Sequence, residues 1–365
     1  MECSKPLNFT DVIHLTHSEI KLTEFLRNHG LLFSFDGPCD HCADGLLVLR
    51  VDNSTRDRFT WRCSYWKCSH KVSFRKHSFF TKSQLPLSTI IEIIYYWTYR
   101  YPQEIVIHET RLNHHTVIDF YKFLWEVCSV ILQEQSEQIG GPGKVVEIDE
   151  INFRKRVNRS NGVEGVWCFG GIERDSHPPK CFFVRVPDCS ASTLIPIITQ
   201  WILFETTIAS NCWKAYSAIQ AEGYIRHTLN HKLHFVSEKS THTSSSERRW
   251  HAVKSSLPRH GVQKKLFSSY FAEYCIRRKH LDTASDKFVA VLDLVSQVYN
   301  PYKSEIRIPA HLEELVPQQQ DTALAATETA ASTCLHSSSP PALQIVTSSE
   351  SDDNESDIKL FVWLQ

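Results

Sequence analysis

No stretch of this sequence approaches the roughly 20 consecutive apolar residues that a helix needs to cross a bilayer, so no membrane partner is expected. The first residues, MECSKPLNFTDVIHL, lack the basic start and apolar core of a secretory signal. No internal repeat is evident. We therefore expect a reducing compartment, where closely spaced members of the 12 Cys are better interpreted as metal ligands than as disulfides.

The composition is that of a globular protein with an acidic end. Hydrophobic residues make up 42% of the 365 residues and charged residues 22%, which is ordinary for a chain long enough to form two domains. The net charge of −1 is the sum of a basic body and an acidic C-terminal segment. Residues 311–365 hold nine acidic residues and one Lys, whereas residues 1–310 hold 39 basic and 32 acidic residues, a net charge of +7. A moderately basic body suits a polyanionic partner.

Hydrophobic periodicity predicts a helical half and a β-rich half. A helix is expected over 18–28, and three more begin near Pro86, Gln103 and Thr116, a pattern that fits either a helix-turn-helix unit or a plain connector. After the glycine-rich breaker 140–143, the pattern predicts an α/β domain with a mixed sheet. Its strands are expected at 145–149, 166–172, 181–186, 206–209 and 227–230, and its helices at 192–203, 213–221 and 244–257.

Residues 318–365 are rich in Gln, Ala, Thr, Ser and Pro and contain a strongly acidic run. Such a segment cannot bury enough apolar surface to offset the entropy of ordering it, so it is expected to be disordered. Its apolar last residues, IKLFVWLQ, are either a docking motif for a protein partner or a plain tail.

Four cysteines stand in two close pairs. Cys39 and Cys42 form a Cys-x2-Cys knuckle, and Cys63 and Cys68 follow about 20 residues later. Two short alternating runs between the pairs, 46–51 and 59–62, are expected to form β-structure. Zinc prefers four soft ligands in a tetrahedron, and its binding supplies folding energy to a segment too small for its own core. The pattern predicts a structural zinc site. Three histidines are alternative ligands for one position: His41, His70 and His77.

Four further positions combine into a candidate catalytic site. Asp149 ends the apolar strand VVEID, and Glu247 lies near the start of the helix expected from 244, where the helix dipole also favours an acid. Lys254 follows Glu247 by seven residues, two turns along the same helical face, and suits a nearby phosphate. Taken alone, each acid is more simply interpreted as an ordinary strand-end or helix-capping residue. Asn211 follows the strand TTIAS.

Several stretches are shared with a known family: VVEIDE, VWCFGGIER, FFVRVPDCSASTLIPIITQWI, TTIASNCWKAY, GYIRHTLNH and HTSSSERRWHAVKSSLP. They resemble the catalytic domain of the Merlin-type DDE transposases and their ISXO-like bacterial insertion-sequence relatives. Upstream, FLRNHGLL, WRCSYWKC and SFRKHSFF resemble the family's N-terminal zinc ribbon. The resemblance covers roughly residues 20–280, and the tail after about 310 has no counterpart.

The resemblance implies an α/β ribonuclease-H-like (retroviral-integrase-like) domain with a mixed sheet, preceded by a zinc ribbon and a helical segment. Together with the composition it divides the chain into six parts. These are an N-terminal helical segment (1–30), the zinc ribbon (31–83), a helical DNA-binding or connector segment (84–139), the DDE transposase-like domain (144–282), a C-terminal extension (283–317) and the disordered acidic tail (318–365).

The resemblance also implies phosphoryl transfer with two Mg²⁺ ions. The first and third acids, which would ligate magnesium, correspond to Asp149 and Glu247, and the lysine that follows corresponds to Lys254. His242 is kept from the family's HTN-x-x-E pattern, although Ser stands at 244 and 246. The second acid falls at Asn211, where relatives read Asp.

Asparagine keeps the shape of aspartate but loses its charge, and Mg²⁺ is a hard cation that prefers carboxylates. The substitution is therefore expected to weaken ion binding and to impair strand cutting and joining. No substitute carboxylate is expected. Glu205 lies six residues before Asn211, and Glu150 should point away from Asp149 because neighbouring strand residues alternate.

Three functions compete. The favoured one is a transposase-derived protein that binds double-stranded DNA with impaired catalysis, either as a decaying element copy or as a gene kept by its host. The second is an active transposase that tolerates Asn211. The third is a non-catalytic adaptor that binds protein partners through the ribbon and the acidic tail. A nuclear location and a homo-oligomer are implied by the resemblance.

Basic residues in three places are candidates for phosphate contacts, with a solvated basic rim as the alternative interpretation. They are Arg248, Arg249 and Lys254 in the last expected helix, Arg154, Lys155 and Arg156 after the first strand, and Arg277, Arg278 and Lys279 further on.

Overall fold

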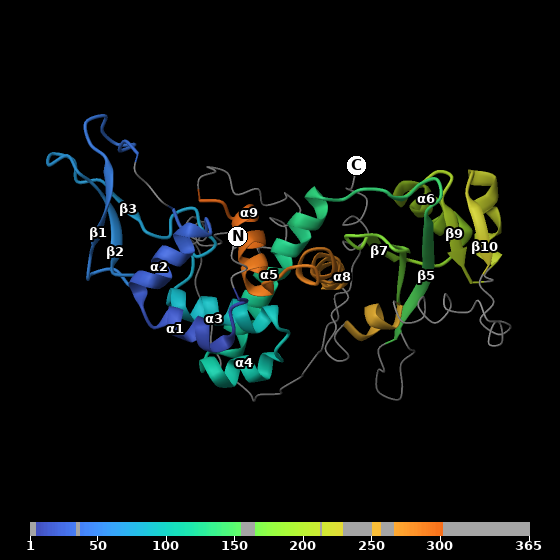
Figure 1. Cartoon of the computed structure of the whole chain (residues 1–365), viewed down its shortest axis with the longest axis horizontal. Coiled ribbons are helices and arrows are strands. Elements are labelled where there is room, and N and C mark those ends of the chain that lie inside the picture. Colours follow the sequence, from blue (N-terminus) through green and yellow to red (C-terminus); the bar gives the residue numbers. More distant parts are fainter. Residues whose placement is uncertain are drawn as a thin grey trace, which may run out of the picture. The chain divides into compact units, whose positions relative to one another are not determined.

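The computed structural model describes residues 5–33, 37–154, 165–211, 214–228, 250–256 and 266–301 (Figure 1). The acidic tail predicted at 318–365 and the second half of the predicted extension lie outside these residues. Within the described ranges, no helix is both long enough and apolar enough to span a membrane.

The cysteine-rich segment forms a small antiparallel sheet in the order β1-β2-β3. Its strands are β1 (Leu47–Val51), β2 (Phe59–Cys63) and β3 (Lys71–Ser73). The β-structure predicted for the two alternating runs is thereby confirmed. Leu47, Trp61 and Val72 are buried and make a core of their own, which the cysteines border. So few apolar side chains cannot stabilise a sheet unaided, which is the situation in which a metal contributes to folding.

Helices from three separate stretches of the chain share one hydrophobic core. They are α1 (Phe9–Thr16), α2 (Glu19–Asn28), α3 (Leu87–Thr98), α4 (Gln103–Thr110), α5 (His114–Glu134), α8 (Phe267–Ile276) and α9 (Lys287–Val298). The helices expected near 18–28, Pro86, Gln103 and Thr116 are confirmed, each within about two residues. A π-helical turn, η3 (Arg277–Leu281), follows α8. The alternative of a helix-turn-helix unit stays a prediction.

The larger sheet has five strands in the order β10-β9-β5-β6-β7. β6 runs antiparallel to both of its neighbours, β5 and β7, whereas β9 runs parallel to β5 and β10 runs parallel to β9. The predicted α/β domain with a mixed sheet is therefore confirmed. The strands are β5 (Val145–Arg154), β6 (Gly165–Glu173), β7 (Cys181–Val186), β9 (Thr207–Ser210) and β10 (Ile225–Thr228), and the helix α6 (Ala191–Trp201) lies between β7 and β9 in the chain.

The helix predicted over 213–221 is a 3-10 helix, η1 (Lys214–Glu222), rather than an α-helix. In a 3-10 helix, residues three apart lie on the same side. Tyr216 and Ile219 have this spacing, and both side chains are fully buried. These two residues therefore form the inner side of η1.

The glycine-rich breaker is explained by close packing. Gly140 has φ +90°, and a Cβ on it would lie 2.4 Å from the Oγ1 atom of Thr206. The next amide, that of Gly141, donates to the same Oγ1 atom at 2.7 Å. Around it, β4 (Ile139–Gly140) pairs with β8 (Ile202–Leu203), so this turn joins the start of β5 to the end of α6.

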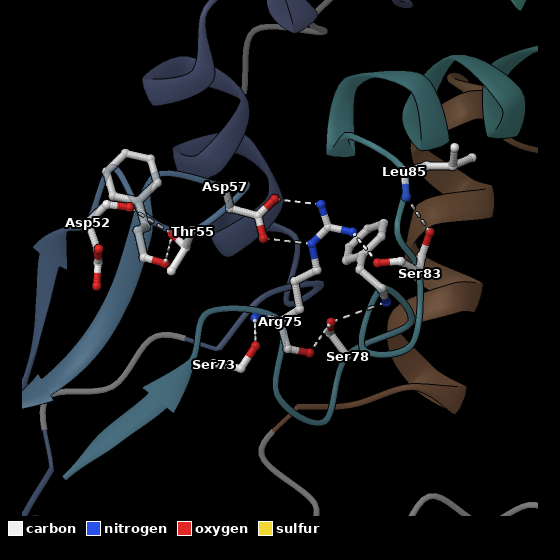
Figure 2. Close-up of polar contacts among 10 residues, drawn as sticks. Asp52, Thr55, Asp57, Ser73, Arg75, Ser78, Ser83 and Leu85 are labelled. Atoms are coloured by element: carbon white, nitrogen blue, oxygen red, sulfur yellow. Dashed lines mark hydrogen bonds and ion pairs between the residues drawn. The ribbon is translucent and has the colours of Figure 1, made fainter.

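A buried arginine connects the small sheet to the start of α3 (Figure 2). Arg75, only 5% exposed, donates from Nε and Nη2 to the two carboxylate oxygens of Asp57 at 2.7 and 2.5 Å. Its Nη1 atom donates to the carbonyl of Ser83 at 3.1 Å. Asp57 lies in the β1–β2 loop, and Ser83 lies just before α3. The bidentate pair therefore fixes the loop against the chain that enters the helical core.

Candidate functional site

The four predicted cysteines lie together in the small sheet. Their sulfur atoms are all within 4.8 Å of one another, and these are the residues of the described chain that gather as soft metal ligands. The sulfurs of Cys39 and Cys68 are 3.9 Å apart and those of Cys42 and Cys63 are 3.4 Å apart. A disulfide has a sulfur–sulfur distance of about 2.05 Å, so these are thiols. Four sulfurs placed tetrahedrally at about 2.3 Å from zinc are roughly 3.8 Å apart, which the observed spacing matches.

The surroundings of the sulfurs also fit a metal. A Cβ on Gly45 would lie 2.3 Å from the sulfur of Cys63, so glycine leaves the space that this thiol occupies. The amide of Tyr65 donates to the same sulfur at 3.4 Å. Backbone N–H groups directed at a sulfur favour the thiolate, which is the form that binds metal. Burial nevertheless raises the pKa of Cys63 to about 12, and the neighbouring thiols add to the effect. A divalent cation would reverse that preference by stabilising the thiolates.

Two of the alternative histidine ligands lie beside this cluster. The Nδ1 atom of His41 is 3.7 Å from the sulfur of Cys68, whereas the Nε2 atom of His70 is 2.8 Å from a carboxylate oxygen of Asp40. The two imidazole rings stack with their centroids 5.3 Å apart. His70 is thereby directed at an acid, which favours the four-cysteine ligand set over the alternatives.

The candidate catalytic site begins where β5 and β9 lie side by side. Asp149 lies on β5, and Asn211 is the first residue after β9. The two strands are parallel with Glu147 opposite Ala209, so Asp149 and Asn211 occupy equivalent positions two residues further on. The two residues, 62 positions apart in the sequence, therefore lie at the same distance beyond the last pair of this ladder.

Asn211 makes its clearest contact with Glu150. Its amide Nδ2 atom donates to Glu150 Oε1 at 3.0 Å, and the hydroxyl of Tyr216 donates to Glu150 Oε2 at 2.6 Å. Glu150, expected only to point away from Asp149, therefore has its carboxylate directed at Asn211. Asn211 is the first residue after β9, whereas Glu150 still lies within the β5–β6 ladder. Glu205 precedes β9 and lies at the strand's other end, as expected.

The electrostatics of this corner are dominated by the acids. Burial, together with the carboxylate of Glu150, holds the pKa of Tyr216 well above its usual value, so the hydroxyl remains a donor at neutral pH. Burial also raises the pKa of the Cys189 thiol to about 11, with Glu150 and Asp188 adding to the effect. Cys189 lies just before α6 and brings that end of the helix to the same corner.

The described residues of this corner do not match a two-magnesium site. Position 211 presents an amide nitrogen to Glu150, and both oxygens of Glu150 accept hydrogen bonds from protein donors. Two adjacent divalent ions need several carboxylates to offset their mutual repulsion. Glu247, the predicted third acid, lies outside the described residues, as does His242.

The candidate phosphate contacts fall differently. Lys254 is exposed on the helical residues 250–256, whose Trp250 and Val253 are buried, as predicted for the inner stripe of that helix. Arg277 is 4% exposed and donates to backbone carbonyls, so the interpretation of that position as a phosphate contact or solvated rim is wrong. Arg278 is exposed and pairs with Asp282 at 3.1 Å, and Lys279 is half-buried. The other candidates lie outside the described residues or have side chains that do: Arg154, Lys155, Arg156, Arg248 and Arg249.

Residues that the sequence analysis missed complete the corner. Tyr216 stands within TTIASNCWKAY, five residues after Asn211, and its spacing gave no hint that it reaches back to β5. Ser210 donates from its hydroxyl to the backbone carbonyl of Asn211 at 3.1 Å, and an Arg226 Nη2 atom lies 3.5 Å from the same oxygen. Polar residues that flank a strand end were the only available signal.

Comparison with known proteins finds similarity to transposases in the region that contains the five-stranded sheet. Residues 139–278 match the family model of the ISXO2-like transposase domain. An uncharacterized transposase-like protein of Haemophilus influenzae is 24% identical to this chain over 95 residues, which are 26% of this chain and 76% of that protein. The two findings support an ISXO2-like transposase family for this part of the chain. The matched range includes the five-stranded sheet, η1 and α8.

Proposed function

We propose that this protein is a transposase-derived DNA-binding protein whose magnesium-dependent strand cutting and joining is impaired. The observation that carries the proposal is the hydrogen bond from Asn211 to Glu150 inside a segment that matches a transposase domain. Where the sequence resemblance implies a metal-binding aspartate, the chain has a neutral amide that is bonded to another acid. That arrangement removes a negative charge needed near Asp149.

The fold supports the same proposal. A mixed sheet with three antiparallel strands and two further parallel strands is compatible with a ribonuclease-H-like nuclease domain. Asp149 lies on β5 and Asn211 directly follows the adjacent parallel strand β9, as expected of residues that once ligated a common ion. The finer resemblance to Merlin-type transposases, with Glu247 as the third acid and Lys254 as the phosphate-binding lysine, belongs to this proposal.

The four-cysteine cluster is proposed to hold a structural zinc. Four protein ligands would leave no open coordination position for water, so the ion would act on folding rather than on chemistry. The cluster would present its knuckles as a rigid unit beside the basic body of the protein. DNA is the proposed partner because residues 1–310 carry a net charge of +7 and the transposase family acts on DNA. A nuclear location and self-association are parts of the same proposal.

A plasmid-nicking assay tests the catalytic part. Supercoiled plasmid is incubated with zinc-loaded protein and Mg²⁺ or Mn²⁺, and Asp149→Ala serves as the matched control. We expect the wild type and Asp149→Ala to be equally inactive. Robust nicking by the wild type that Asp149→Ala abolishes would support the second candidate, an active transposase that tolerates Asn211.

Salt-dependent binding tests the DNA part. The affinity for a random-sequence duplex is measured as salt rises, and its logarithm should fall linearly with the logarithm of salt concentration, by about 0.9 for each phosphate contacted. Binding that is absent at low salt would favour the third candidate, a protein-binding adaptor. Imaging of the tagged chain and light scattering of the purified chain test nuclear location and self-association.

A further inference from the structure

The side chains of Asn211 and Tyr216 both donate to the carboxylate of Glu150, just beyond the last pair of the β5–β9 ladder. We propose that this network, named here the Glu150 lock, holds the ends of the two strands together without a divalent cation. Asn211 is therefore a stabilising replacement, in addition to being a loss of charge. The inference rests on the proposed function in one respect, namely that position 211 formerly held a metal-binding acid.

The geometry of the lock accounts for both oxygens of one carboxylate. Glu150 Oε1 accepts from the Nδ2 atom of Asn211 at 3.0 Å, and Oε2 accepts from the hydroxyl of Tyr216 at 2.6 Å. The three residues come from β5, from the end of β9 and from η1. The Glu150 carboxylate thus links β5 to the end of β9 and to η1. β5 and β9 have no backbone pairing with each other at this position.

Both donors of the lock are held in place. Tyr216 is fully buried, so its ring fixes the position of the hydroxyl. The backbone carbonyl of Asn211 accepts from the hydroxyl of Ser210 at 3.1 Å, and Arg226 approaches it at 3.5 Å. A carboxylate that meets prepositioned donors loses little entropy when it binds them, and a charged acceptor makes each bond stronger than a neutral one.

An aspartate at position 211 would turn the attraction to Glu150 into a repulsion between two carboxylates. It has no N–H to donate, so two carboxylate oxygens would face each other at about the distance of a hydrogen bond. Such a pair is stable only if one acid takes up a proton or a cation lies between them. With aspartate, this end of the sheet depends on a metal ion. With asparagine, the amide N–H donates to the Glu150 carboxylate, so this end of the sheet no longer depends on a metal ion.

Four proteins test the lock: the wild type, Asn211→Asp, Glu150→Gln, and the double variant Glu150→Gln/Asn211→Asp. The double variant exchanges the amide and the carboxylate and keeps one donor facing one acceptor. Thermal unfolding is followed for zinc-loaded protein in buffer freed of other divalent cations, and again with millimolar Mn²⁺. Glu222→Gln, which neutralises an exposed acid on η1 outside the lock, is the matched control.

We expect Asn211→Asp to lower the melting temperature by on the order of 5 °C without Mn²⁺ and to regain most of it with Mn²⁺, because a ligand that binds only the folded state stabilises it. The double variant should recover at least half of the loss without Mn²⁺. The wild type and Glu222→Gln should not respond to Mn²⁺. This pattern would not follow if Asn211 merely filled space, because the exchanged pair would then be no better than either single variant.

Two results would overturn the lock. One is an Asn211→Asp protein as stable as the wild type in the absence of Mn²⁺, and the other is a double variant no more stable than Asn211→Asp. If Glu150→Gln fails to fold, the response of Asn211→Asp to Mn²⁺ still decides the question. Wild-type nicking of plasmid would refute the proposed function, whereas recovery of stability by the double variant without Mn²⁺ would still support the lock, so the two failures are distinguishable.

Discussion

The guanidinium of Arg277 lies 4.1 Å from the centroid of the Trp97 ring and donates to the carbonyl oxygens of Trp97 and Thr98 at 2.6 and 2.7 Å. These carbonyls are at the end of α3, where a helix lacks partners for its last C=O groups. A third contact, from Nε to Glu273 at 2.6 Å, pairs the buried charge. One side chain therefore closes the end of α3 from a position about 180 residues later in the sequence.

Arg277→Ala is expected to destabilise the protein strongly. The substitution leaves Glu273 and two backbone carbonyls without their donor in a buried environment, which costs about 3–5 kcal/mol for a buried pair. Urea unfolding measures the loss. Arg278→Ala is the matched control because its side chain is 44% exposed, and its effect should be much smaller. Equal losses for the two variants would contradict the structural role of Arg277.

Asp57→Ala is expected to unfold the connection between the small sheet and α3. It leaves Arg75 as an unpaired charge with a 6% exposed side chain, at a cost of about 3–5 kcal/mol. The control is Arg62→Ala, which removes an arginine–aspartate pair whose arginine is 42% exposed. Limited proteolysis between β3 and α3, alongside urea unfolding, should show faster cleavage in Asp57→Ala and unchanged cleavage in the control. Unchanged cleavage in both variants would remove Arg75 from its linking role.

Cys63→Ser is expected to abolish metal binding by the small sheet. A serine hydroxyl is a harder and weaker ligand for zinc than a thiolate, and three thiolates hold the ion less tightly than four. Metal content after purification with zinc should fall from one ion per chain to well below one. Cys189→Ser, a thiol outside the cluster, should keep the full content. One ion per chain in Cys63→Ser would mean that other residues bind the metal.

Alkaline pH should destabilise the fold partly through Tyr216. Burial, followed by the carboxylate of Glu150, raises the pKa of Tyr216 in the folded state, so the folded chain keeps a proton that the unfolded chain releases above about pH 10. This contribution is complete below that pH and is lost as the pH rises. The free energy of unfolding of Tyr216→Phe should fall less steeply above about pH 10, by up to about 1.4 kcal/mol per pH unit. Identical slopes would mean that Tyr216 ionises freely.

Much of the sheet could be predicted from the sequence because its strands are apolar and bounded by turn residues. Residues 181–186 were assigned with the bounds that β7 has, since its side chains alternate between buried and half-buried. α8 was missed for the opposite reason. Seven of its ten residues are buried, so it has no polar face and therefore no helical period to detect. α1 is only eight residues long, and its one signal was the capping pair Asn8 and Asp11.

The candidate site was predictable only in part. The closeness of Asp149 and Asn211 followed from the resemblance, and the parallel pairing of β5 with β9 agrees with it. The contact between Asn211 and Glu150 did not follow from any pattern, because it joins a strand to a residue beyond the end of the neighbouring strand. Such contacts depend on where a backbone ladder stops, which periodicity alone does not determine.

The packing of α8 affects whether the transposase-like segment can fold when it is produced without the rest of the chain. Its residue Glu273 accepts a hydrogen bond from the indole of Trp125 on α5 at 2.7 Å, and Phe271 stacks on Phe183 of β7. The region of sequence similarity contains α8 and β7 but begins only after α5 has ended. A fragment cut at residues 139 and 278 would expose one side of α8 to water and would be prone to aggregation. The segment that matches the transposase domain is therefore smaller than the unit that folds.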